Sequence, residues 1–231
     1  MSIRKDKIFN KVDKDFSKAK NILFRQFDIL EDLIIKGMDN IPEEMLMEFK
    51  KNEDKLDQFE IRISEEIIQI IVLHQPMASD LRQIISYFRM IGNIERIGDQ
   101  INNIVSFISK LTPRSIPSDQ QDSVLNMFTM SLNMVKKSLI SFEEEDQEYA
   151  IWTIKNDEVV DDLQYRLVKL LINKKTPEGV QPLELYNVLN FNSILSSIER
   201  IADNATNIAE ASIYYQKGID LRHQEVDEED L

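Results

Sequence analysis

Four pairs of acidic residues in this chain are spaced four positions apart, so that each pair should share one face of a helix. The pairs are Glu53/Asp57, Glu95/Asp99, Asp157/Asp161 and Glu199/Asp203. Carboxylate oxygens grouped in this way are the donors that Mg²⁺, Ca²⁺, Mn²⁺ or iron take in proteins. Because 41 of the 231 residues are acidic, a single such pair indicates only a solvated helix face. Whether the four pairs form a functional site therefore depends on where each pair lies along its helix and on whether the pairs come together.

An internal duplication sets the register of the four pairs. Residues 94–104 read IERIGDQINNI and residues 198–208 read IERIADNATNI, with seven of eleven positions identical at an offset of 104. The same offset pairs Glu53 with Asp157 and Asp57 with Asp161. Self-similarity at one fixed offset predicts a tandem repeat, and each half then carries two of the acidic pairs.

The two pairs within each half are expected to meet. At 1.5 Å per residue, Asp57 lies roughly 27 Å before the turn at Gln75–Pro76, and Glu95 lies about 30 Å beyond that turn on the next helix. Glu95 also continues a seven-residue series that begins at Leu81 and Phe88, so an acid interrupts an apolar seam. The pattern predicts a cluster of four carboxylates between neighbouring antiparallel helices in each half.

Four neighbouring carboxylates repel one another strongly enough to raise their pKa values or to require a cation. A bound metal ion would relieve this repulsion, and three nearby amides could orient the carboxylates: Asn102, Asn103 and Asn207. The alternative is that arginines neutralise the acids in buried ion pairs, with four candidates: Arg62, Arg82, Arg96 and Arg200. The spacing alone leaves both interpretations open.

The elements that would hold these residues are long helices. Apolar residues recur every three or four positions between the prolines, and Gly and Pro supply only 5 and 6 residues. This periodicity predicts six helices, at about Ile8–Gly37, Glu43–His74, Met77–Leu111, Ser118 or Asp119 to Phe142, Glu148–Asn173 and Pro182–Lys217. A linker at Pro113–Pro117, a loop at Lys174–Gln181 and an acidic tail at Glu225–Asp230 complete the chain.

These elements predict an all-α fold in which six long antiparallel helices form two tandem, similar three-helix bundles. The expected units are residues 1–113 for the first repeat, 118–218 for the second, and 219–231 for the acidic tail. Such a chain is long enough to bury a core without disulfides or other cross-links.

Composition removes several classes of function. A net charge of −13 opposes nucleic-acid binding. The absence of cysteine excludes disulfides, thiolate metal sites and cysteine catalysis, and two histidines, His74 and His223, cannot build a zinc protease. No apolar run approaches the length of a membrane span, and the first residues do not resemble a signal peptide, so we expect a cytoplasmic protein.

Several segments together resemble the PhoU family of phosphate-uptake regulators. Residues 95–99 and 199–210 are similar to its paired signatures, and QPMASDLR at 75–82 is similar to the turn into its third helix. The resemblance extends over about residues 5 to 217. The family often has a histidine after the second aspartate, where this chain has Gln100 and Asn204. The expected metal is therefore left open among iron, zinc, manganese and magnesium.

The resemblance implies metal ions on both carboxylate clusters and a non-enzymatic regulator. Such a protein would restrain high-affinity phosphate uptake and its two-component signalling by contacting two partners, the phosphate ABC transporter ATPase and the phosphate-sensing histidine kinase. It would reach the membrane peripherally through these partners, and homodimerisation is a further expectation.

Two other functions remain as alternatives. One is a hydrolase with an oxygen-ligated multinuclear metal site, for which no base or substrate pocket can be named from the sequence. The other is a purely structural helical scaffold. A ferritin-like oxidase is excluded, because neither histidine stands three residues after a glutamate.

Overall fold

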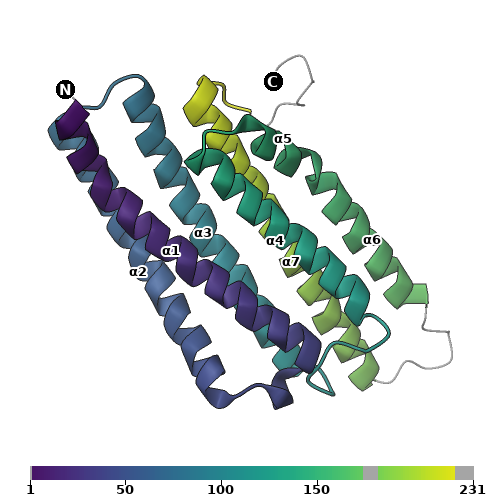
Figure 1. Cartoon of the computed structure of the whole chain (residues 1–231). Helices are drawn as coiled ribbons and strands as arrows, with labels where there is room; N and C mark the ends of the chain where they lie inside the picture. The colour runs from purple at the N-terminus through teal and green to yellow at the C-terminus, as the bar shows by residue number, and fades with distance from the viewer. Residues whose placement is uncertain (1, 174–181, 222–231) are drawn as a thin grey trace.

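A computed structural model describes residues 2–173 and 182–221 of the chain. The helices are α1 (Ser2–Lys36), a short 3₁₀ turn η1 (Met38–Asn40), α2 (Glu43–His74), α3 (Ser79–Lys110), α4 (Gln121–Glu143), α5 (Gln147–Lys155), α6 (Asp157–Asn173) and α7 (Pro182–Lys217). Helices α1–α3 form one three-helix bundle and α4–α7 form the second, which confirms the predicted all-α fold (Figure 1). Among the described residues, no helix is both long and apolar enough to cross a membrane.

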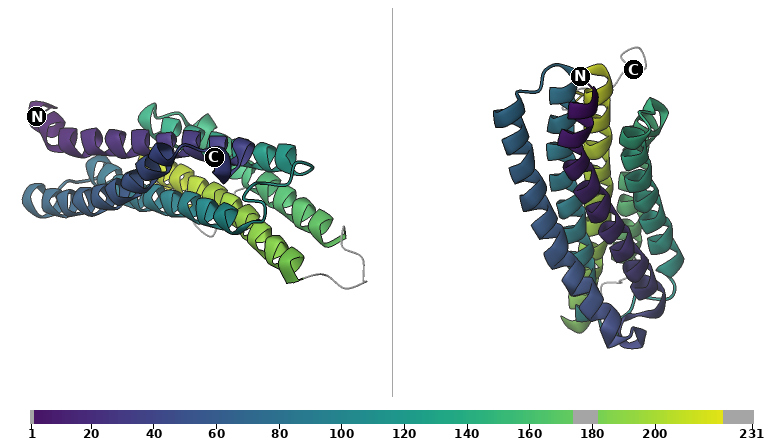
Figure 2. Two further views of the ribbon diagram at one scale, coloured as in Figure 1. Left: turned by 90° about the horizontal axis from the view of Figure 1, so that it is seen from below. Right: turned by 60° about the vertical axis from the view of Figure 1, so that its left-hand side comes forward.

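The two bundles join through α3 and α7, which make the most extensive helix–helix contact and run antiparallel side by side (Figure 1). Helices α1 and α4 cover one side of this central pair, and α2 and α6 flank it (Figure 2). The Ser86 hydroxyl on α3 donates to the carbonyl of Ala211 on α7 at 2.8 Å, and Arg82 Nε donates to the Tyr215 carbonyl at 3.2 Å. The start of α3 is thus fixed beside the end of α7.

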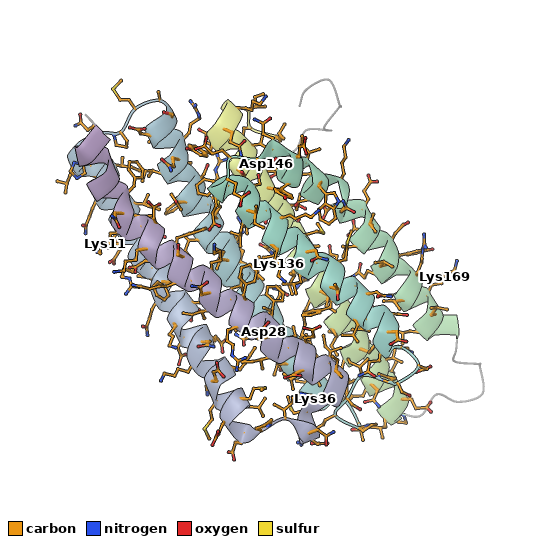
Figure 3. All side chains as sticks on the ribbon, in the orientation of Figure 1. Lys11, Asp28, Lys36, Lys136, Asp146 and Lys169 are labelled. Carbon is orange, nitrogen blue, oxygen red and sulfur yellow. The ribbon has the colours of Figure 1, made fainter. Side chains whose placement is uncertain are left out.

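Aromatic rings fill the junction between the bundles. The Tyr87 ring on α3 lies 5.0 Å from that of Phe16 on α1 and 4.8 Å from that of Phe142 on α4, both edge to face. Phe142 in turn lies 5.3 Å from Tyr215 on α7. Edge-to-face pairs add to the stabilisation that buried apolar area already supplies. Charged side chains such as Lys136 and Lys169 lie on the outside of the helices (Figure 3).

The helix bounds agree with the sequence at α2 and α7. Helix α1 begins at Ser2 rather than near Ile8, and α3 spans Ser79–Lys110 rather than Met77–Leu111. Two further differences are larger. The predicted start at Ser118 or Asp119 is wrong: α4 begins at Gln121, after a turn in which the Gln120 amide donates to the Pro117 carbonyl. The predicted single helix 148–173 is divided at Asn156 into α5 and α6. At this break the Asn156 backbone amide donates to the carbonyls of Trp152 and Thr153, each at 3.2 Å. The loop 174–181 and the tail 225–230 lie outside the described residues.

Candidate metal centres

The first cluster consists of Glu53 and Asp57 on α2 with Glu95 and Asp99 on α3. The two glutamates are half-buried and the two aspartates are exposed. Burial raises the pKa of Glu53, and the negative charges of Asp57 and Asp99 raise it further. Burial likewise raises the pKa of Glu95 and of Asp99, with repulsion from Asp57 added in both cases. The α2–α3 hairpin therefore brings the two acidic pairs near enough for their charges to repel one another.

The second cluster consists of Asp157 and Asp161 on α6 with Glu199 and Asp203 on α7. Burial, followed by repulsion from Asp161, raises the pKa of Asp157 to about 6. Burial also raises the pKa of Glu199 and of Asp203, and Asp161 again adds repulsion to both. The division at Asn156 places Asp157 in the first turn of α6. The two acidic pairs of the second half are thus also adjacent.

Both clusters have one pattern of burial. In each acidic pair the first residue is half-buried and the second is exposed. The offset of 104 places each acid of the second cluster at the position of its counterpart in the first. The duplication therefore preserves the surroundings of the carboxylates as well as their order in the chain.

Arginines do not neutralise these carboxylates by direct pairing. In the described part of the chain, none of the eight acids lies within ion-pair distance of a lysine or arginine. Arg62 instead pairs with Asp15 at 2.9 Å and stacks on Phe59, and Arg82 donates to a backbone carbonyl. Arg96 acts only at longer range: its charge lowers the pKa of Asp203 and of Glu95 without outweighing burial. The exposed Arg200 acts similarly on Glu199.

The three predicted amides have different positions. Asn207 donates its side-chain amide to the Asp203 carbonyl at 2.8 Å and so braces the backbone of a cluster residue. Asn102 is half-buried and its Nδ2 is buried without a hydrogen-bond partner. Asn103 is exposed. Within the described residues none of the three amides donates a hydrogen bond to a cluster carboxylate, so their orienting role stays a prediction.

Two further residues near the clusters were not predicted from the sequence. Glu60 on α2 repels Glu95 and so extends the first cluster by a fifth acid. Thr206 lies beside Asp157 and lowers its pKa, although its hydroxyl does not reach the geometry of a full hydrogen bond. The offset of 104 could have found Thr206, because it pairs this residue with Asn102.

The donor chemistry of the two clusters suits hard cations, since each offers four carboxylates and no nitrogen or sulfur. Within the described ranges, no three acidic or histidine side chains converge closely enough to surround a metal ion in the conformation seen. The residues therefore suit a metal ion in the type of their donor atoms, although the side chains as they lie do not surround one. His74 lies at the end of α2 and is exposed, apart from either cluster.

Comparison with known proteins adds to this geometry. The PhoU domain model matches residues 17–108 and 124–212, two stretches that contain one cluster each. A phosphate-specific transport system accessory protein PhoU homolog from Burkholderia is 32% identical over 175 residues, covering 75% of this chain and 73% of that protein. The corresponding homolog from Aquifex aeolicus is 28% identical over 221 residues, covering 94% and 98%.

Two solved structures have the same architecture. The crystal structure of PhoU from Pseudomonas aeruginosa superposes with a TM-score of 0.83 at 26% identity, covering 93% of this chain and 99% of that one. The phosphate transport system regulatory protein PhoU from Streptococcus pneumoniae superposes with a TM-score of 0.79 at 24% identity, covering 96% and 99%. The second likeness bears on the fold alone.

Proposed function

The chain belongs to the PhoU family, and from this premise we propose that it is a non-enzymatic regulator of phosphate uptake. The relatives over most of its length are named as accessory proteins of the phosphate-specific transport system. In this role the protein contacts the phosphate ABC transporter ATPase and the phosphate-sensing histidine kinase in the cytoplasm, and so restrains high-affinity uptake and its signalling. Attachment to the membrane is then peripheral and occurs through these partners.

The same proposal assigns metal ions to the two clusters. Glu53, Asp57, Glu95 and Asp99 hold one centre, and the second is held by Asp157, Asp161, Glu199 and Asp203. The observation that carries this assignment is the repeated set of four mutually repelling carboxylates without an ion-pair partner among the described residues. A bound divalent ion supplies the positive charge that such a set lacks. Iron, zinc, manganese and magnesium all remain candidates.

Each metal would join carboxylates of two packed helices that repel one another without it. In the first bundle the carboxylates belong to α2 and α3, and in the second to α6 and α7. When a bound metal ion replaces the repulsion between these carboxylates, it holds the outer helices α2 and α6 rigidly against the central pair, α3 and α7. A rigid acidic surface is the form expected of an adaptor that presents one face to a partner.

Binding to the purified transporter ATPase subunit tests the regulatory role directly. We expect the wild-type protein, loaded with Mn²⁺, to bind this subunit in a calorimetric titration, and to bind at least tenfold more weakly after chelation. Exposed Asp28 on α1 provides a control, because Asp28→Asn removes one charge away from both clusters. Absence of binding to the ATPase subunit and to the cytoplasmic part of the kinase would contradict the proposed role.

A further inference from the structure

The turn between α2 and α3 carries the three most exposed large apolar side chains of the described residues. Val72, Leu73 and Met77 have exposed fractions of 66%, 72% and 79%. Two further exposed apolar side chains lie close to them along the same two helices, and we call the five together the apolar tip: Ile68, Val72, Leu73, Met77 and Leu81. Single exposed apolar residues are common on proteins, whereas a group of them marks a surface that contacts something else.

The first turns of α1 run beside this tip. Lys11 of α1 pairs with Glu66 of α2, and Lys11 and Leu73 line one small hollow between the two helices. Because α1 and α2 are antiparallel, residues 2–10 continue from Lys11 toward the end of α2 (Figure 1). The start of α1 and the α2–α3 turn therefore lie together at one end of the elongated molecule (Figure 2).

This end of the first bundle is locally basic. Residues 2–11 and 66–83 contain five basic and three acidic side chains, a net charge of +2, although the whole chain carries −13. The acidic end of α4 belongs to the second bundle, where Glu145 accepts a hydrogen bond from Tyr215 of α7. The first carboxylate cluster lies roughly 27 Å from the turn along α2. Since charges in physiological salt are screened over about 8 Å, the tip presents its own positive charge.

The second repeat has no equivalent tip. The offset of 104 places Thr176, Pro177 and Gln181 at the positions of the three most exposed apolar residues. The first ten residues of α1 contain four basic side chains, whereas the first ten of α4 contain Asp122 and neither lysine nor arginine. The duplicated helix plan therefore does not account for the apolar tip or for the basic residues beside it.

We propose that the apolar tip and the basic start of α1 bind directly to a membrane surface that contains anionic lipids. Leu73 and Met77 enter the boundary between headgroups and acyl chains, and the positive charge of α1 attracts the lipid phosphates. A few side chains at the end of a hairpin offer much less area than the about 800 Å² that each partner buries in a stable protein interface. This lipid contact is additional to the proposed attachment through protein partners.

Cosedimentation of the full-length protein with lipid vesicles tests this contact. We expect binding to vesicles of phosphatidylcholine and phosphatidylglycerol in equal amounts to be about tenfold tighter than to phosphatidylcholine alone. Leu73→Ser combined with Met77→Ser should weaken this binding about tenfold, because it removes the inserted apolar groups. The matched control, Leu189→Ser combined with Met47→Ser, changes the same residue types at exposed positions away from the tip. The control should bind as the wild type does.

The electrostatic part is tested by Lys5→Gln and Lys7→Gln, each of which should weaken binding to the anionic vesicles about fivefold and leave binding to neutral vesicles unchanged. Wild-type protein that binds neither vesicle, or equal binding by the wild type and the Leu73→Ser/Met77→Ser variant, would overturn the inference. If the wild type does not bind vesicles but this variant loses the transporter ATPase subunit, the tip is a protein surface and the lipid assignment is wrong.

The vesicles contain no protein, so this result does not depend on the proposed regulatory role. Vesicle binding by a protein that binds neither the ATPase subunit nor the kinase would support the lipid contact and contradict the proposed function. Partner binding without vesicle binding would have the opposite meaning.

Discussion

Glu95 on α3 and Glu199 on α7 occupy equivalent places 104 residues apart, each half-buried beside an exposed aspartate of the neighbouring helix. Asp57 is that aspartate in the first bundle and Asp161 in the second. Burial and repulsion act on both glutamates in the same sense. The duplication has therefore kept a locally unfavourable arrangement twice, which is expected where function rather than stability selects the residues.

The first prediction concerns pH in chelator-treated protein. The pKa of Asp157 is about 6 in the folded state against 3.8 for an ordinary aspartate. Between these values the folded state binds more protons than the unfolded state, so the free energy of unfolding falls as pH rises through this window. Allowing for solvent screening of a half-exposed group, we expect a loss on the order of 1 kcal/mol between about pH 4 and 6.

Urea unfolding at several pH values measures this effect as the difference between wild type and Asp157→Asn. The variant removes the contribution of Asp157 and leaves the other carboxylates, so the difference isolates one group. A difference that stays constant from pH 4 to pH 7 would show that Asp157 titrates normally in the folded protein.

The second prediction separates metal ligation from ion pairing. Without metal, Asp99→Asn and Asp203→Asn each remove a repelling charge, so each should leave the fold intact and raise the free energy of unfolding by up to about 0.5 kcal/mol. With Mn²⁺ present, the same variants should lose the stabilisation that the wild type gains on binding. Thermal unfolding with and without metal measures both effects, and Asp28→Asn serves as the control. Cooperative destabilisation without metal would instead indicate ion pairs.

The third prediction uses two glycines of α3 as a matched pair. A Cβ at Gly98 would lie 2.9 Å from Leu56 Cδ1, whereas a Cβ at Gly92 has open space. Alanine improves helix propensity at both positions by about 1 kcal/mol. We therefore expect Gly92→Ala to stabilise the protein by roughly this amount and Gly98→Ala to destabilise it by about 1 kcal/mol or more. Urea unfolding compares them, and a gain in stability for both would contradict the close α2–α3 approach.

The fourth prediction concerns the junction between the helices. Tyr87 on α3 hydrogen-bonds to Asp13 on α1, and burial raises the pKa of Asp13 while this hydrogen bond lowers it. Tyr87→Phe should cost about 1–2 kcal/mol, because it leaves a partly buried carboxylate without its donor. Tyr165→Phe on the exposed face of α6 should change stability little. Equal effects of the two substitutions in chemical unfolding would argue against the Tyr87–Asp13 contact.

Much of this architecture follows from periodicity and duplication. The bounds of α2 and α7 and the grouping of the acidic pairs could be predicted, because helical register and the offset of 104 fix them. The division at Asn156 could not, because Asn52 at the equivalent position lies within an unbroken helix. The start of α4 depended on a turn after Pro117 rather than on a capping side chain.

The surroundings of the site were harder to predict than its members. That the first acid of each pair is half-buried and the second exposed depends on how the third helix of each bundle packs. That Gly92 faces open space also depends on how the neighbouring helices are placed, since in the sequence this residue is only a costly glycine within a helix. Gly98, six residues later, instead lies where α3 packs closely against Leu56 of α2. Residue type alone could not separate the two.

The metal content of the protein tests the central claim most directly. Protein purified without chelator, incubated with Mn²⁺, Fe²⁺, Zn²⁺ or Mg²⁺ and then desalted, is measured by elemental analysis. We predict that the wild type retains at least one of these metals at both clusters, that Asp99→Asn loses about half of it, and that Asp99→Asn combined with Asp203→Asn loses nearly all of it. Wild-type protein that retains no more metal than the double variant would contradict the assignment of the two carboxylate clusters.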